Sequence, residues 1–167
     1  MSKAFTLIEL LVVVSIIVLM TALTLPNYRF GDKQLALQRS AYRTAQNLRM
    51  AQEYAISAKE FNGTVPLGYG VYFDLTKPTA YILFADVDGN QAYSGINEKV
   101  EEISLETSVV LVNLVPATPQ SSLTILFVPP DPTIYFSPDA ASAVINIKVE
   151  ALQKTVQVNK AGLISVE

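Results

Sequence analysis

The sequence contains no cysteine, no histidine and no tryptophan. Without cysteine the fold holds no disulfide bond. Without cysteine or histidine it also lacks Ser-His-Asp and Cys-His nucleophiles and the usual zinc ligands. Only 16% of the residues are charged, and the net charge of −3 gives no general affinity for nucleic acid. These absences exclude the common nucleophilic and zinc-dependent enzymes.

What the chain does have is one long apolar segment near its N-terminus. It runs from Ala4 to Leu25 and carries a single charge, Glu9. About 20 apolar residues are enough for a helix to cross a bilayer, so the segment has the length of a membrane span. Placing a carboxylate in hydrocarbon costs roughly 2–3 kcal/mol or more, so we expect Glu9 to have a functional role.

Two simple interpretations of this segment are a secretory signal peptide and a plain membrane anchor. A signal peptide has an apolar stretch of about 7–15 residues followed by a small-residue cleavage site. Here the stretch is longer, and it ends in Thr24-Leu25-Pro26-Asn27-Tyr28 without such a site. A plain anchor fits the length but leaves Glu9 unexplained. The few lysines and arginines on either side give no firm orientation.

A third interpretation comes from the run Lys3-Ala4-Phe5-Thr6-Leu7-Ile8-Glu9-Leu10-Leu11-Val12-Val13. It resembles the class III signal of type IV prepilins and type II secretion pseudopilins. In that family a short basic leader is cut before an aromatic residue, which is then N-methylated, and a glutamate follows four residues later. Phe5 and Glu9 occupy those two places. Ala4 replaces the usual glycine before the cut, so cleavage is expected but slower.

The resemblance implies a precursor with a leader of residues 1–4 and a transmembrane and polymerisation helix of residues 5–26. Phe5 would be N-methylated, and Glu9 of one subunit would pair with the Phe5 amine of the next. Breaking such a pair costs about 3–5 kcal/mol in an apolar bundle. The implied partners are a prepilin peptidase, other pilin or pseudopilin subunits, an assembly platform in the inner membrane, and lipid before assembly.

The implied location is the cytoplasmic membrane, crossed once, with an extracytoplasmic head that later joins a cell-surface or periplasmic filament. The implied role is structural, so no enzymatic activity is expected. The alternative from another class is a single-pass anchored extracytoplasmic β-domain that binds a ligand or calcium.

Residues 27–62 are predicted to continue the helix in amphipathic form. Pro26 matches the proline that kinks many pilin helices, and with Gly31 it predicts a kink or a short melted segment up to Asp32. Beyond it, alanine and leucine recur at steps of three and four from Leu37 to Ala58, and Asn62-Gly63 is a helix stop.

The alanines and leucines that recur from Leu37 to Ala58 share one side of this helix, which we call the alanine face. Charged residues of the helix fall mostly off it. Arg39 and Arg43 lie one turn apart, which favours a solvated face or contacts between subunits. A DNA-binding patch is the less favoured interpretation, so nucleic acid is not an expected partner.

Residues 63–167 change to short runs of branched and aromatic residues separated by turn residues. The runs are Gly70–Phe73, Ala80–Phe84, Ile103–Leu105, Val109–Val112, Leu123–Val128, Thr133–Phe136, Val144–Val149, Thr155–Val158 and Gly162–Val166. They predict an α+β fold in which a long N-terminal helix packs on an antiparallel β-rich head. This is the pilin outline, and loose patterns in the head resemble the H-type minor pseudopilins.

One head segment, Asp86-Val87-Asp88-Gly89-Asn90, has the composition of a metal loop. Oxygens of Asp86, Asp88 and Asn90 could hold calcium, but the spacing does not match an EF-hand. A β-hairpin turn at Asp88-Gly89 is the favoured interpretation. Several glutamates that follow, from Glu98 to Glu106, make this side acidic. No other cofactor is expected.

Overall fold

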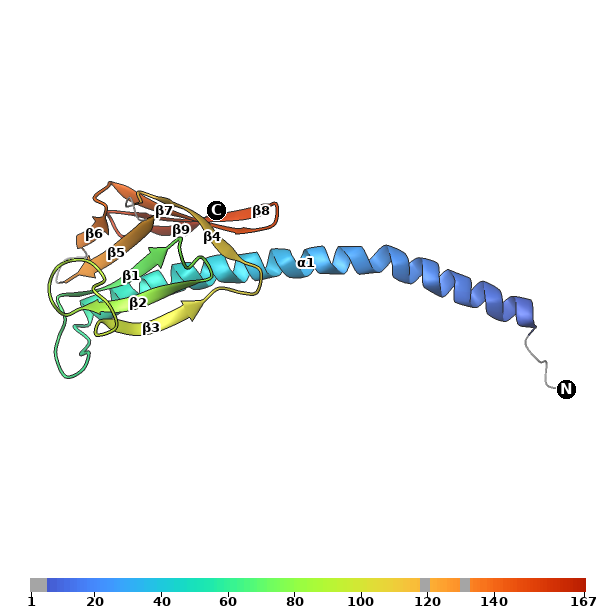
Figure 1. Ribbon diagram of the computed structural model, residues 1–167, viewed down its shortest axis with the longest axis horizontal. Helices are drawn as coiled ribbons and strands as arrows, with labels where there is room; N and C mark the ends of the chain where they lie inside the picture. The colour runs from blue at the N-terminus through green and yellow to red at the C-terminus, as the bar shows by residue number, and fades with distance from the viewer. Residues whose placement is uncertain (1–5, 118–120, 130–132) are drawn as a thin grey trace. The chain divides into compact units, whose positions relative to one another are not determined.

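The computed structural model describes residues 6–117, 121–129 and 133–167, and the side chains of residues 25–29 are not described. One helix, α1 (Leu7–Ile56), is followed by strands β1 to β9 (Figure 1). The chain divides into an N-terminal unit, Met1–Leu35, and a second unit, Ala36–Glu167, which we call the head. Helix α1 contributes residues to both units.

Helix α1 continues through Pro26 and Gly31 without a break in its helical backbone. The expectation of a melted segment between Pro26 and Asp32 is therefore wrong. A proline removes one intrahelical hydrogen bond, but its fixed φ is compatible with a helix, so a long helix can absorb that loss. The kink at Pro26 and Gly31 stays a prediction.

The C-terminal end of α1 comes earlier than the sequence indicates. The N–H of Ala58 donates to the Ala55 carbonyl (3.1 Å), and the N–H of Lys59 donates to the Tyr54 carbonyl (3.1 Å). This is a Schellman motif, and Ala58 takes the left-handed position at φ 48° that glycine usually fills. The predicted stop at Asn62-Gly63 instead forms a tight turn with both residues at positive φ, closed by the Phe61–Thr64 bridge.

The head contains two antiparallel sheets, which confirms the predicted β-rich class. The five-stranded sheet has the order β3-β2-β1-β5-β6, and the four-stranded sheet has the order β4-β7-β8-β9. Each predicted run overlaps one strand. The bounds are β1 (Gly68–Asp74), β2 (Ala80–Asp86), β3 (Lys99–Ser104), β4 (Val110–Val115), β5 (Ser122–Val128), β6 (Thr133–Ser137), β7 (Ser142–Val149), β8 (Leu152–Asn159) and β9 (Ile164–Val166).

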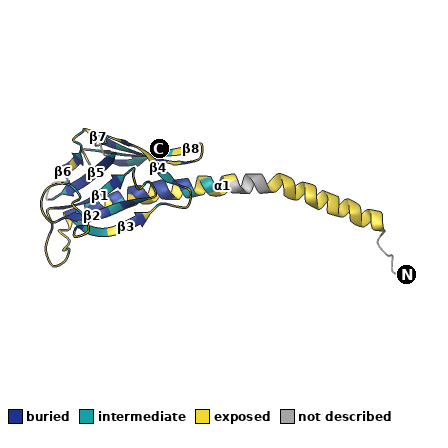
Figure 2. Cartoon of the chain, in the orientation of Figure 1, coloured by how far each residue is buried: buried dark blue, intermediate teal, exposed yellow. Residues whose placement is uncertain are grey.

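Both sheets share one core with the head portion of α1 (Figure 2). The alanine face is buried as predicted, except that Ala58 is exposed beyond the helix end. Small side chains on this face let the sheets approach the helix closely. Polar groups on it are paired: the Asn47 amide donates to the Tyr81 hydroxyl (2.8 Å), and the Ser40 hydroxyl accepts from the Glu106 N–H (3.1 Å).

The five-stranded sheet has a second, outer face on the side away from α1. Strand β1 alternates between the core, which receives Tyr69, Val71 and Phe73, and the outer face. On the outer face Gly70 lies between Phe84 of β2 and Leu126 of β5, and both of these side chains are buried. Gly70 is required by close packing, because a Cβ there would lie 2.7 Å from the Phe84 ring.

Candidate functional site

The first candidate site is the start of α1, where Thr6 and Glu9 form a reciprocal cap. The Thr6 N–H and hydroxyl lie 3.4 and 3.3 Å from Glu9 Oε2, and the Glu9 N–H donates to Thr6 Oγ1 at 3.3 Å. This is a capping box, in which side chains reciprocally accept from the backbone N–H groups of Thr6 and Glu9; the Glu9 N–H also donates to the Thr6 carbonyl at 3.1 Å. Glu9 therefore has a local structural role that the sequence analysis missed, although the Thr-x-x-Glu spacing signals it.

The helix that follows this cap is long and apolar enough, over Leu7–Thr24, to cross a membrane. The described residues bury none of the side chains in that stretch. The hydroxyls of Ser15, Thr21 and Thr24 each donate to the carbonyl four residues earlier, so their polar groups are satisfied within the helix. Glu9 is the only charged residue of the stretch. Ala4 and Phe5, the predicted cleavage and methylation residues, lie outside the described residues.

The second candidate site is the loop of residues 87–98 that joins β2 to the antiparallel strand β3. Carboxylate oxygens of Asp86, Asp88 and Glu98 lie within 4.8 Å of one another. Asp86 and Glu98 are buried and Asp88 is exposed. Glu98, which the sequence places only in a general acidic surface, thus joins the two predicted aspartates. Its burial, set by the fold of the loop, carries no local sequence signal.

Asn90, the third predicted ligand, contacts this carboxylate group through Asp88. Its side-chain amide donates to Asp88 Oδ2 (2.9 Å) and to the Ser94 hydroxyl, and its carbonyl oxygen accepts from the Ala92 N–H (2.8 Å). Asn90 therefore closes the exposed part of the loop on itself.

Backbone N–H groups occupy the oxygens of the two buried carboxylates. Asp86 accepts from Gly89 (2.8 Å) and Gln91 (3.1 Å), while Glu98 accepts from Val87 (3.2 Å) and Ser94 (2.8 Å). These bonds hold the loop in its shape.

The electrostatics of the loop follow from this burial. Desolvation raises the pKa of Asp86 and the nearby Glu98 and Asp88 charges add to the rise, whereas the N–H donors of Gln91 and Gly89 oppose it. Calcium takes six to eight oxygens, so three carboxylates would supply only part of a calcium site. The role that the geometry supports directly is to organise the loop. Strands β2 and β3 do pair as an antiparallel hairpin, but the whole segment 87–98 connects them, so the predicted tight turn at Asp88-Gly89 is wrong.

Comparisons with known proteins identify no relative of this chain: no family model, no curated protein and no solved structure matches it. Function must therefore be argued from the chain itself.

Proposed function

We propose that the chain is a structural subunit of a type IV pilus or a type II secretion pseudopilus. A prepilin peptidase would cut it between Ala4 and Phe5, and it would polymerise through its N-terminal helix. The single observation that carries this proposal is the position of Glu9, four residues after Phe5 in the sequence, as the only charge in the otherwise apolar and exposed helical stretch Leu7–Thr24.

The physical argument starts from the exposed apolar side chains of Leu7–Thr24. Because no part of the chain that the structure describes buries them, they need either lipid or other helices around them. Cleavage would place an α-amine on Phe5, and in a bundle of such helices a carboxylate is its natural partner. A Glu9–amine pair between subunits would then fix the register of the bundle, as single buried polar groups do in coiled coils.

The capping box offers a competing explanation for Glu9, and one substitution separates the two. Glutamine at the third helical position can still accept from Thr6, so Glu9→Gln keeps the cap but removes the charge. We expect Glu9→Gln to insert in the membrane and to remain helical, yet to yield few sheared filaments or pseudopili. Mass spectrometry of the N-terminus would report cleavage and methylation at Phe5 in the same samples.

Thr6→Val is the matched control, because it removes the side-chain half of the cap and leaves the Glu9 charge in place. It should polymerise far better than Glu9→Gln. If Glu9→Gln polymerises like the unmodified chain while Thr6→Val fails, Glu9 acts as a helix cap only. The same result would favour a lone membrane-anchored β-domain. An N-terminus at Met1 or Ser2 in native membranes would contradict processing.

A further inference from the structure

Within the head, α1 has one side that no other described element covers. This side, which we call the arginine face, consists of Gln38, Arg39, Tyr42, Arg43, Gln46 and Arg49, all exposed. Arg39 and Arg43 lie one helical turn apart and form no ion pair with the described residues, and Tyr42 between them is 55% exposed. Arg49 is partly engaged, because it donates to the Ile164 carbonyl (3.1 Å). The arginine face therefore offers the guanidinium groups of Arg39 and Arg43, neither of which is in an ion pair with the described residues, beside the Tyr42 ring.

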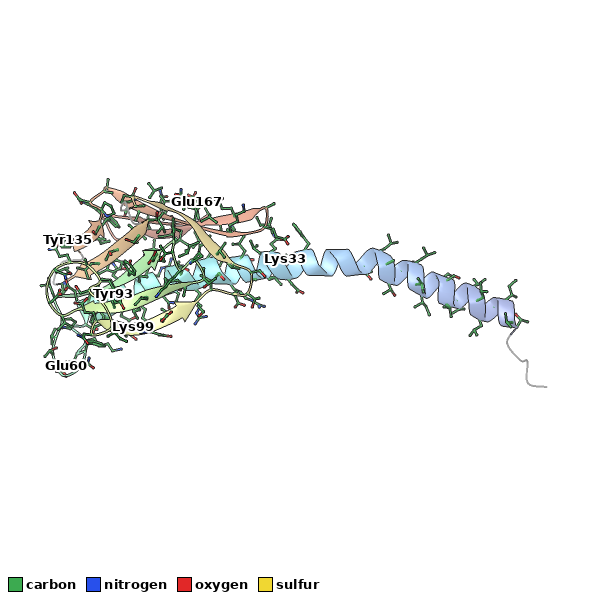
Figure 3. All side chains as sticks on the ribbon, viewed as in Figure 1. Lys33, Glu60, Tyr93, Lys99, Tyr135 and Glu167 are labelled. Atoms are coloured by element: carbon green, nitrogen blue, oxygen red, sulfur yellow. The ribbon has the colours of Figure 1, made fainter. Side chains whose placement is uncertain are left out.

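On the opposite side of the head, the outer face of the five-stranded sheet carries a groove of about 220 Å³. The strand register builds it, because Tyr72, Ile82 and Glu102 lie side by side across β1, β2 and β3. Tyr93 reaches over from the loop and stacks on Tyr72 with ring centroids 5.1 Å apart. Figure 3 shows Tyr93 next to this sheet. The residues that line the groove include Tyr72, Asp74, Lys77, Ile82, Tyr93 and Glu102.

The chemistry of the groove suits a flat, cationic side chain with an aliphatic stem. The rings of Tyr72 and Tyr93 line the groove, and arginine is the more frequent cation–π partner of such rings. Asp74 and Glu102 supply carboxylates to the groove lining. Glu102 already meets Lys99 at 3.1 Å in an exposed pair, which is weak enough to be shared. Two lysines lie near these carboxylates: Lys77, which lines the groove and is exposed, and Lys99, which pairs with Glu102.

We propose that the arginine face of one copy of this chain docks on the Tyr72–Tyr93 groove of a second copy. The two surfaces lie on opposite sides of the same head, α1 on one side of the five-stranded sheet and the groove on the other. Because the two surfaces differ, a docked pair still has one free arginine face and one free groove. Further copies can therefore dock in the same way, from copy to copy. The inference rests on the proposed function, since a polymer is what brings the heads together, and it names the surfaces through which they meet.

Because the chain has no cysteine, introduced cysteines are its only thiols, which allows a site-specific cross-linking test. Two differently tagged full-length chains are produced together, one with Gln46→Cys on the arginine face and one with Thr76→Cys at the rim of the groove. Oxidation of the native membranes should give a disulfide-linked heterodimer. The control pair combines Gln46→Cys with Gln153→Cys, an exposed position on β8 in the other sheet. We expect the first pair to give about tenfold more cross-linked product than the control pair. A tenfold difference corresponds to about 1.4 kcal/mol of contact free energy.

Charge reversal then tests whether these residues make the contact. Arg39→Glu with Arg43→Glu in the first copy, or Asp74→Lys with Glu102→Lys in the second, should each reduce cross-linking to the level of the control pair. Combining both reversed copies should restore it in part. Tyr93→Phe, which keeps the ring, should cross-link normally, whereas Tyr93→Leu should lose most of the yield.

Equal yields for the test and control pairs would overturn the docking, as would reversed charges that leave the yield unchanged. The yield of filaments from the same cells tests the proposed function separately from the docking. Filaments without the 46–76 cross-link contradict only the docking. The cross-link in membranes that yield no filaments supports the docking and contradicts polymerisation.

Discussion

The close packing at Gly70 predicts that adding a single methyl group there unfolds the head more readily. In Gly70→Ala the new Cβ would lie 2.5 Å from the Ile125 carbonyl oxygen and 2.7 Å from the Phe84 ring. The oxygen belongs to the paired strand β5, so it cannot move without separating β1 from β5. The ring is buried and also contacts Tyr93, with centroids 5.6 Å apart. A shift of Phe84 is therefore passed on to the loop that forms one wall of the groove.

The expected magnitude follows from two opposing terms. Overpacking a buried site costs about 1–3 kcal/mol and occasionally more, and a backbone obstacle favours the upper part of that range. Alanine gains about 0.5–1 kcal/mol over glycine in a strand through lower chain entropy. The net loss of unfolding free energy should be about 2 kcal/mol, or roughly 5–10 °C in Tm for a domain of this size.

Thermal and urea unfolding of the full chain in detergent would measure this loss. Near-ultraviolet circular dichroism is a suitable probe, because without tryptophan it reports mainly the packing of tyrosines. Gly31→Ala is the matched control: a Cβ there meets nothing within 4 Å, so no loss is expected. Adding Phe84→Leu to Gly70→Ala should recover part of the stability. If Gly70→Ala were as stable as the unmodified chain, the reasoning from close packing would be refuted.

Two further predictions concern the helix end and the buried carboxylate. Ala58→Gly should raise the unfolding free energy by about 0.5–1 kcal/mol in urea titrations, because glycine takes the left-handed conformation without strain; an unchanged midpoint would contradict this. Because burial raises the pKa of Asp86 above 3.8, the folded head binds that proton more tightly than the unfolded chain. The contribution of protonated Asp86 to the unfolding free energy is therefore largest below about pH 4 and is lost as the pH rises through the raised pKa. Urea titrations at several pH values should show that Asp86→Asn removes this part of the pH dependence.

Much of the fold could be predicted from the sequence, because local patterns and tertiary contacts agree there. The alternation of Val144–Val149 predicts one buried and one wetter face, and β7 has that pattern. The alanine face likewise predicts the side of α1 that the sheets cover. The first half of β3 was missed because Lys99, Glu101 and Glu102 give an edge strand without an apolar alternation. The helix end was misplaced because Ala58, with no special turn propensity, takes the left-handed position.

The candidate sites could be predicted less well, since they depend on contacts that no local pattern encodes. Asp86 and Asp88 were singled out by their spacing, but the inclusion of Glu98 depends on how the whole loop folds back toward β2. The groove depends on the register of three strands and on where the loop places Tyr93. The sequence shows Glu9 as a lone charge, and the Thr6-x-x-Glu9 spacing is the local signal of its pairing with Thr6.

The pairing of β1 with β5 sets a timing constraint on synthesis. The chain leaves the ribosome N-terminus first, so α1 and the β1-β2-β3 meander exist before Ser122–Val128 has been made. Until then one edge of β1, including the bare backbone at Gly68 and Gly70, has no partner and is open to pairing with other chains. Mistakes in strand pairing should therefore concentrate in this interval, and a chaperone that shields nascent β1 would act while the stretch up to β5 is being translated.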